Sequence, residues 1–317
     1  MRLHRLLCWI AVLGGCAHGG GNDSDARAGN TSERAPAHAE GTFEGPGGTL
    51  FYEVRGGRAG RPLVLINGGP GFDHTQLLVV PAAWDRLAQG RPVVLYDQRG
   101  TGRSFALKPG APDTLEEQVA DLEALRVHLA AETIDVAGHS SGGYIAMAYA
   151  ARHPDRVSRL VLVDSGPLTP SEARDLLGEL FPDVVARQAA VNASQDPSGQ
   201  DAVNELRRLR RMMLFCSPEN RDNYIKLAAH LPFSQQVNAA LSEDINRLDL
   251  TPRARGFGMP VMIVTGRFDV VVPPSIAYKV HQQIPGSRFV IFERSGHLPF
   301  VEEPDAFATE LESFLAN

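Results

Sequence analysis

Cysteine is scarce in this chain of 317 residues, which contains only three. Cys8 lies in an N-terminal segment that we expect to be removed, and Cys16 in a position where we expect acylation. Cys216 would then have no partner. The sequence therefore excludes a fold that depends on disulfide bonds, and we expect Cys216 to pack as a small apolar residue.

Long runs of one charge are also absent. The net charge is −6, and the basic residues do not form uninterrupted blocks, so we expect no nucleic-acid partner. No dinucleotide-binding glycine pattern follows the first predicted strand, and His297 has no His or Asp at metal-ligand spacing, so we expect neither metal nor redox cofactor. Hydrophobic residues make up 43% of the chain, enough for a full core.

A Gly-x-Ser-x-Gly pattern is the strongest positive signal. It reads Gly-His-Ser-Ser-Gly at 138–142, between a strand-like run (133–137) and an Ala-rich, helix-like run (143–152). This strand-turn-helix context is what a nucleophile elbow requires, because small residues on either side of the serine let strand and helix pass closely. We predict that Ser140 is a nucleophile.

An acid and a base follow this serine in an informative order. Asp269 and His297 each lie just beyond a predicted strand, and the chain order Ser-Asp-His is that of the α/β-hydrolases. A serine hydroxyl needs an imidazole to take its proton, and the imidazole needs a carboxylate to fix its tautomer. Asp164, after strand-like 160–163, is an alternative acid, although a turn residue is the simpler interpretation.

A glycine-rich loop supplies the third part of the predicted site. Asn67, Gly68, Gly69, Pro70 and Gly71 follow the apolar run 62–66. Acyl transfer builds negative charge on a carbonyl oxygen, which preorganised N–H groups stabilise. Because proline cannot donate, we predict the N–H groups of Gly69 and of Ser141, directly after the nucleophile, as the oxyanion hole. A simple tight turn is the alternative.

Strand and helix patterns alternate along most of the chain, which predicts a mostly parallel, eight-stranded sheet with helices on both faces. The seven strands that the pattern locates are near 50–54, 63–66, 93–96, 134–137, 160–163, 261–265 and 289–292. The helices are expected near 76–87, 114–131, 142–153, 275–283 and 304–315. Between 168 and 255 only helical patterns occur, and we predict a helical cap there, inserted after the sixth strand into a core of 42–167 and 256–317.

The N-terminus carries a targeting pattern. Basic residues precede an apolar run (6–13) that is too short to span a bilayer, and Leu-Gly-Gly-Cys at 13–16 resembles the bacterial lipobox. We therefore expect a signal peptide over 1–15, lipidation of Cys16 and a flexible tether over 16–41. The protein would then be an envelope lipoprotein held on a membrane by its lipid; a soluble secreted protein is the alternative.

These motifs resemble those of the prolyl aminopeptidase (proline iminopeptidase) family of α/β-hydrolases. That family carries His-Gly-Gly-Pro-Gly and Tyr-Asp-Gln-Arg-Gly-x-Gly-x-Ser, which correspond here to 67–71 and 96–104. The resemblance covers about 50–165 and about 259 to the end. Asn67 replaces the family's histidine, and the elbow differs from its usual Gly-Gly-Ser-Trp-Gly. We interpret Asp97 and Arg99 as scaffold for the oxyanion loop.

The resemblance implies a serine hydrolase that forms an acyl-enzyme on a small peptide or amide and releases an N-terminal residue. The elbow is equally typical of esterases and lactonases, so an ester-cleaving enzyme remains an alternative, as does a catalytically silent lipoprotein that binds a ligand. In the family, acidic cap residues bind the substrate amine. Glu205, Glu219 and Glu243 are candidates for this role, although each alone is typical of a solvated helix.

Overall fold

The computed structural model of the protein describes residues 37–57, 59–107, 113–169, 172, 176–194 and 200–316. The predicted signal peptide, Cys16 and most of the predicted tether lie outside these residues. The tether prediction extended too far, since the backbone of 38–41 already pairs with the next strand in an antiparallel ladder. Residues 35–317 form one compact unit.

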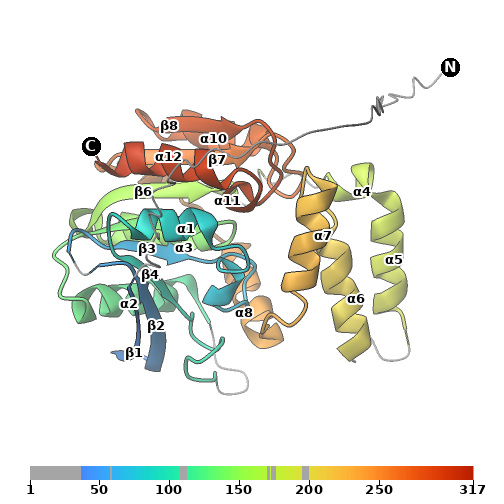
Figure 1. Cartoon of the computed structure of the whole chain (residues 1–317), viewed down its shortest axis with the longest axis horizontal. Helices are drawn as coiled ribbons and strands as arrows, with labels where there is room; N and C mark the ends of the chain where they lie inside the picture. The colour runs from blue at the N-terminus through green and yellow to red at the C-terminus, as the bar shows by residue number, and fades with distance from the viewer. Residues whose placement is uncertain are drawn as a thin grey trace, which may run out of the picture. The chain divides into compact units, whose positions relative to one another are not determined.

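One sheet carries the fold, with the strand order β1-β2-β4-β3-β5-β6-β7-β8 (Figure 1). The strands are β1 (His38–Gly45), β2 (Gly48–Arg55), β3 (Leu63–Ile66), β4 (Val93–Tyr96), β5 (Ile134–His139), β6 (Val157–Val163), β7 (Val261–Gly266) and β8 (Arg288–Phe292). β1 and β2 form an antiparallel edge, and β3 to β8 pair in parallel. The predicted α/β-hydrolase sheet is confirmed. The alternation had not located β1.

Helices cover both faces of the sheet. Those of the core are α1 (Ala82–Ala88), α2 (Leu115–His128), α3 (Gly142–Arg152), α10 (Pro274–Gln283), α11 (Pro299–Glu302) and α12 (Pro304–Ala316), with short 3₁₀ turns at His74–Gln76 and Pro154–Arg156. Buried side chains of the strands alternate between two hydrophobic clusters, as the two-residue period of a strand requires. One cluster joins the sheet to α2, α3 and α10, and the other joins it to α1, α11 and α12.

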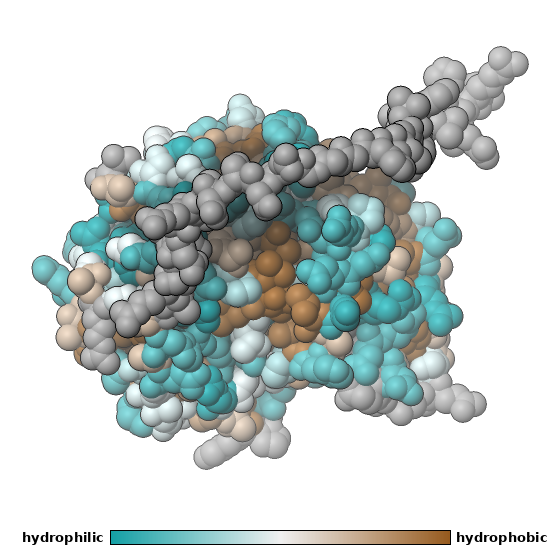
Figure 2. All heavy atoms as spheres, viewed as in Figure 1, coloured by the Kyte–Doolittle hydropathy of each residue, from teal (hydrophilic) through white to brown (hydrophobic). Residues whose placement is uncertain are grey.

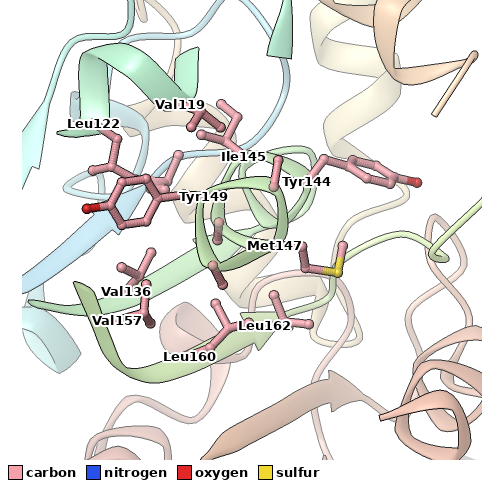
Figure 3. Close-up of a cluster of buried hydrophobic side chains, with 14 of the residues drawn as sticks. Val119, Leu122, Val136, Tyr144, Ile145, Met147, Tyr149, Val157, Leu160 and Leu162 are labelled. Atoms are coloured by element: carbon pink, nitrogen blue, oxygen red, sulfur yellow. The ribbon is translucent and has the colours of Figure 1, made fainter. Parts of the chain in front are cut away.

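Helix α3, which follows the elbow, is buried almost along its whole length. Figure 3 shows Ile145 and Tyr149 of α3 close to Val119 and Leu122 of α2, with Leu160 and other strand residues on the sheet side. A helix that is apolar on most of its circumference must be enclosed. The turn at Ser140 is therefore attached to a helix that is enclosed by the core.

The predicted helix over 76–87 is shorter in the structure. A 3₁₀ turn ends at Gln76, and α1 begins only after Pro81. Proline lacks the N–H of a continuing helix and disfavours helical backbone at the preceding residue, so the helix starts after it. In contrast, the predicted start of α2 is correct: Thr114 and Glu117 form a reciprocal capping box.

The described residues between β6 and β7 form six helices, α4–α9, which we call the cap. They are α4 (Leu177–Leu180), α5 (Pro182–Asn192), α6 (Gln200–Arg211), α7 (Pro218–Leu227), α8 (Gln235–Ile245) and α9 (Thr251–Ala254). In Figure 1, α4 to α7 stand together beside the core, whereas α8 and α9 pack on α2 and α3. Figure 2 shows hydrophobic residues at the middle of this face, where the cap adjoins the core. Among the described helices, none is both long and apolar enough to cross a membrane.

Candidate active site

Ser140 occupies the sharp turn between β5 and α3. Its backbone has a φ of 52°, a conformation that is unfavourable for residues other than glycine and typical of strained functional turns. The flanking glycines are required by close approach: a Cβ at Gly142 would lie 2.4 Å from the backbone oxygen of Ile66. At Gly138 it would lie 2.5 Å from the oxygen of Gly142. The local geometry is that of a nucleophile elbow.

Asp269 and His297 meet beyond the ends of β7 and β8. The Nδ1 atom of His297 lies 2.7 Å from Oδ2 of Asp269, and both side chains are buried. The other oxygen of Asp269 accepts hydrogen bonds from the backbone N–H groups of Val271 and Val272, at 2.8 and 3.0 Å. Three donors thus converge on this carboxylate, which favours its ionised form and keeps the proton on Nδ1 of the imidazole. The other ring nitrogen of His297 is then free to accept a proton.

His139, directly before the nucleophile, holds the loop of His297. Its Nε2 atom lies 3.0 Å from the backbone oxygen of His297, and the two rings are 4.9 Å apart. Because a carbonyl oxygen only accepts, Nε2 must carry the proton. Burial, and then the nearby His297, lower the pKa of His139 to about 3, so the ring stays neutral. Sequence analysis treated this position only as a departure from the family elbow.

The glycine-rich loop at 67–71, predicted to bind the oxyanion, passes directly beside Ser140. A Cβ at Gly68 would lie 2.7 Å from Cβ of Ser140, so only glycine allows this approach. Gly69 has a φ of 57° and Gly71 a φ of 100°, both in the region that favours glycine. Ser141 lies at the N-terminus of α3, where the backbone N–H groups lack helical acceptors. The loop and this helix end therefore lie on two sides of the nucleophile.

Asn67 and Gln98 brace the base of this loop. The Asn67 amide donates to the backbone oxygen of Phe72 at 2.9 Å. The Gln98 amide donates in turn to the backbone and side-chain oxygens of Asn67, at 3.1 and 3.2 Å. Asn67 thus donates a hydrogen bond within its own loop and accepts one from Gln98, which follows β4. At this position, where the resembling family has histidine, asparagine has a structural role.

Residues of the cap also form hydrogen bonds with the loop at 67–71. The Ser234 N–H donates to the Gly71 oxygen at 2.7 Å, and the Asn238 amide donates to the Pro70 oxygen at 2.9 Å. The Phe72 and Phe233 rings pack 4.8 Å apart, with a short β-bridge between their backbones. The loop that we predict to bind the oxyanion is therefore clamped between core and cap.

A buried charged cluster supports the turn that follows the loop. One oxygen of Asp97 accepts from the backbone and Nδ1 of His74, at 3.1 and 2.5 Å, and Nε2 of His74 lies 3.1 Å from Glu53. Burial opposes a charge on His74, but these two carboxylates outweigh it and raise its pKa to about 9. Burial likewise raises the pKa of Glu53, but His74 and Arg55 outweigh it and lower that pKa to about 2. His74 and Glu53 are thus stabilised in their charged forms at the turn that follows the glycine-rich loop.

Arg99 works separately from this cluster. Its guanidinium donates to both oxygens of Asp121 on α2, at 2.7 and 2.9 Å. It thereby attaches the turn after β4 to α2. Asp97 therefore binds the turn at His74, whereas Arg99 binds helix α2.

Glu302 links the cap to the loop of His297. Its carboxylate accepts backbone hydrogen bonds from Gly296 at 2.6 Å, Ser217 at 2.7 Å and Cys216 at 3.2 Å. The His297 N–H donates to the Leu214 oxygen at 2.7 Å. The segment that leads into α7 is therefore held against the loop that carries His297. Sequence analysis did not single out Glu302, and no motif in the sequence marks it.

An apolar pocket opens at the nucleophile. Its volume is about 180 Å³. It is lined by Ser140, Ser141, Tyr144, Gly166, Pro167, Val271, Val272, Pro273 and Ile276. No charged side chain belongs to this lining, which suits an uncharged, compact group beside the serine.

The predicted amine-binding acids lie elsewhere in the cap. Glu205 forms ion pairs with Arg208 at 2.8 Å and Arg187 at 3.5 Å. Glu243 is exposed and pairs with Arg247 one helical turn away, and Glu219 is exposed in the first turn of α7. None of the three lines the described pocket at Ser140.

Two groups of side chains in the described part of the chain have the spacing of metal ligands. One is His38, Glu40 and Glu53, and the other is Asp164, Asp269 and His297. In the second group Nδ1 of His297 carries the proton donated to Asp269, so it has no free lone pair for a metal. In the first, Glu53 is already bound to Arg55 and His74. Glu53 in the first group and the His297–Asp269 pair in the second are thus already engaged in hydrogen-bonded ion pairs.

Comparison with known proteins places this geometry in a family. The chain matches the α/β hydrolase fold family over residues 61–304. It is 31% identical over 276 residues to a proline iminopeptidase of Saccharolobus solfataricus, covering 84% of this chain and 87% of that protein. It is 28% identical over 292 residues to a proline iminopeptidase of Heyndrickxia coagulans, covering 84% and 97%.

Solved structures with the same fold include enzymes that act on esters. A thermophilic esterase from Thermogutta terrifontis has a TM-score of 0.67 and 25% identity, covering 88% of this chain and 98% of that one. An enol-lactonase from Burkholderia xenovorans has a TM-score of 0.68 and 25% identity, covering 87% and 100%.

Proposed function

The chain belongs to the α/β hydrolase fold family and is a hydrolase, and from that premise we propose that it is a serine exopeptidase of the prolyl aminopeptidase type. The observation that supports the chemistry is the buried hydrogen bond between His297 and Asp269, beside a serine in a strained elbow. The observation that supports the substrate is the near full-length likeness to proline iminopeptidases. The substrate would be a short peptide or amide with a free N-terminus.

We assign the catalytic roles as follows. Nε2 of His297 removes the proton of Ser140 as Oγ attacks the scissile carbonyl carbon, and Asp269 stabilises the imidazolium that forms. The N–H groups of Gly69 and Ser141 receive the negative charge on the carbonyl oxygen. His297 then gives the proton to the leaving amine, the C–N bond breaks, and water releases the acyl group by the same steps.

An esterase or lactonase is the second candidate, and the pocket favours it. The lining beside Ser140 contains no carboxylate that could pair with a substrate amine. The cap acids Glu205 and Glu243 are engaged by arginines. An uncharged acyl group fits these surroundings without an unpaired buried charge.

Paired substrates separate the two candidates. We expect proline arylamide to be cleaved faster, relative to its uncatalysed rate, than a short-chain aryl ester. Blocking the proline nitrogen should abolish the amide reaction and leave the ester reaction unchanged. Ester cleavage with no amide cleavage would overturn the peptidase proposal.

The nucleophile is tested independently of the substrate. A fluorophosphonate should label the wild-type protein at Ser140 and leave Ser140→Ala unlabelled, with both proteins folded. Absence of labelling in the wild type would overturn the proposed serine mechanism and leave a ligand-binding role.

For the cellular location, we propose an envelope lipoprotein anchored through Cys16. The support is the lipobox-like sequence at 13–16. Expression in bacteria with a radioactive fatty acid should label the wild type but not Cys16→Ala. An unlabelled wild-type protein found in the soluble fraction would instead support secretion.

A further inference from the structure

Asp164, which follows β6, lies beside the proposed catalytic acid. The residue is fully buried, and its backbone has a φ of 45°. Its N–H donates to the Val264 oxygen at 2.9 Å, and its Oδ1 accepts from the Gly266 N–H at 2.9 Å. These two bonds attach Asp164 to Val264 and Gly266, near the end of β7. The side chain is therefore held in a fixed position.

Asp164, Asp269 and His297 each place one polar side-chain atom within 4.8 Å of the other two. The second oxygen of Asp164, Oδ2, is buried and has no hydrogen-bond partner among the described residues. An unpartnered buried carboxylate oxygen is costly, whereas a protonated one can donate to an adjacent acceptor. The neighbouring carboxylate of Asp269 is such an acceptor.

Two carboxyl groups this close in an enclosed site cannot both carry a charge. Asp269 accepts from three donors, namely the His297 ring and the N–H groups of Val271 and Val272. Asp164 accepts from the Gly266 N–H and, more weakly, from the Thr265 side chain. The larger number of donors stabilises the ionised form of Asp269, so the shared proton belongs on Asp164.

We propose that Asp164 is a positioning residue for catalysis: it stays a neutral carboxylic acid and donates a hydrogen bond to Asp269. This inference rests on the proposed catalytic roles of Ser140, Asp269 and His297. Burial, and then the charge of Asp269, raise the pKa of Asp164 well above its usual range, in agreement with the hydrogen-bond count.

The donated bond has a consequence for the base. It delocalises the charge of Asp269 and so weakens the attraction of Asp269 for the His297 proton. The titratable groups around this site are His139 at the end of β5, Asp164 after β6, Asp269 after β7 and His297 after β8. His139 stays neutral because burial lowers its pKa to about 3, so Asp164 and Asp269 are the neighbouring groups whose charge can act on His297.

Two substitutions test this inference. Asp164→Asn keeps a neutral donor and an acceptor, and asparagine tolerates a positive φ; Asp164→Gly removes both groups and suits the same backbone. The readout is the rate of fluorophosphonate labelling of Ser140 as a function of pH, because its fall on the acid side reports protonation of His297. This readout needs no knowledge of the natural substrate.

We expect Asp164→Asn to keep the acid-side midpoint of the wild type. Asp164→Gly should raise the midpoint by about 0.5 to 1 pH unit, since an unassisted Asp269 attracts the His297 proton more strongly. If Asp164 were ionised, the asparagine would remove a charge and lower the midpoint. A shift in either direction for asparagine overturns the proposal, as does a folded glycine variant with an unchanged midpoint.

The asparagine result decides the question even if the glycine variant does not fold. Failure of the wild type to react with the fluorophosphonate would instead overturn the proposed function, so the two failures are distinguishable.

Discussion

The ring of His139 donates a hydrogen bond of 3.0 Å to the backbone oxygen of His297. The residue before the proposed nucleophile thus holds the loop that carries the proposed base, although 158 positions separate them. One strand end positions both partners of the proton transfer, so a displacement of the elbow moves the base with it.

Replacement of His139 by leucine should lower kcat by about fivefold, because loss of one buried hydrogen bond of about 1 kcal/mol loosens the His297 loop. His128→Leu, on the outer side of α2, is the matched control and should leave kcat unchanged. Steady-state kinetics on the aryl ester measures both. A wild-type kcat in His139→Leu would show that the loop is held without this bond.

Replacement of Glu302 by alanine should lower both stability and activity. It leaves three backbone N–H groups, those of Cys216, Ser217 and Gly296, without their acceptor. We expect a loss of about 2 kcal/mol or more in the free energy of unfolding, measured by urea denaturation, and a lower kcat.

The control for Glu302 is Glu293→Ala, which removes an exposed carboxylate paired with Arg267. Surface pairs contribute little to stability, so this variant should unfold like the wild type. Equal stability of the two variants would contradict the role assigned to Glu302.

Replacement of Gly142 by alanine should destabilise the fold strongly. The new Cβ would lie 2.4 Å from the Ile66 oxygen and 2.6 Å from the Asn67 oxygen, and backbone atoms cannot move aside cheaply. We expect a loss of roughly 3 kcal/mol or more and a clearly lower Tm. Gly258→Ala, where nothing lies within 4 Å, should change the Tm little; similar values for both variants would refute the close-approach argument.

Stability should depend on pH through His74. Its pKa is raised from 6.5 to about 9, so the stabilisation is complete below about pH 6.5 and is lost as the pH rises through about 9. The shift corresponds to at most about 3 kcal/mol. Urea denaturation between pH 6 and pH 10 should show this loss, and His74→Gln should lack it.

Glu53 acts at the other end of the pH scale. Its pKa is lowered from 4.5 to about 2, so its contribution is present above pH 4.5 and is lost as the pH falls toward 2. The two groups together stabilise the protein most between about pH 4.5 and 6.5. An alkaline loss that is equally large in His74→Gln would show that other groups cause it.

The sequence predicted the sheet well because its signals are local. The buried strands β3 and β4 are continuous apolar runs, and their bounds agree with the prediction. The start of α2 is also local, because it is fixed by a capping box within four residues. β1 was missed because its alternating, mostly exposed residues resemble a polar tether. The predicted helix over 76–87 was too long because Pro81 interrupts it, and α1 begins only at Ala82.

The sequence by itself determined the order and types of the reactive groups: a serine in a glycine-flanked elbow, a later acid and a later histidine. It could not determine which of two acids faces the histidine, since Asp164 and Asp269 both follow strands of the same sheet. Only the tertiary structure shows that Asp269 is hydrogen-bonded to His297 and that Asp164 lies next to this pair.

The same limit applies to the supports of the site. Glu302, His139 and the cap residue Ser234 act through hydrogen bonds to backbone atoms far away in the chain, and such bonds leave no residue pattern behind. Elbow and strands are encoded by neighbouring residues, so the chain alone reveals them. The choice of acid and the clamping of the oxyanion loop depend on long-range packing, and that is decided only when the sheet brings its strand ends together.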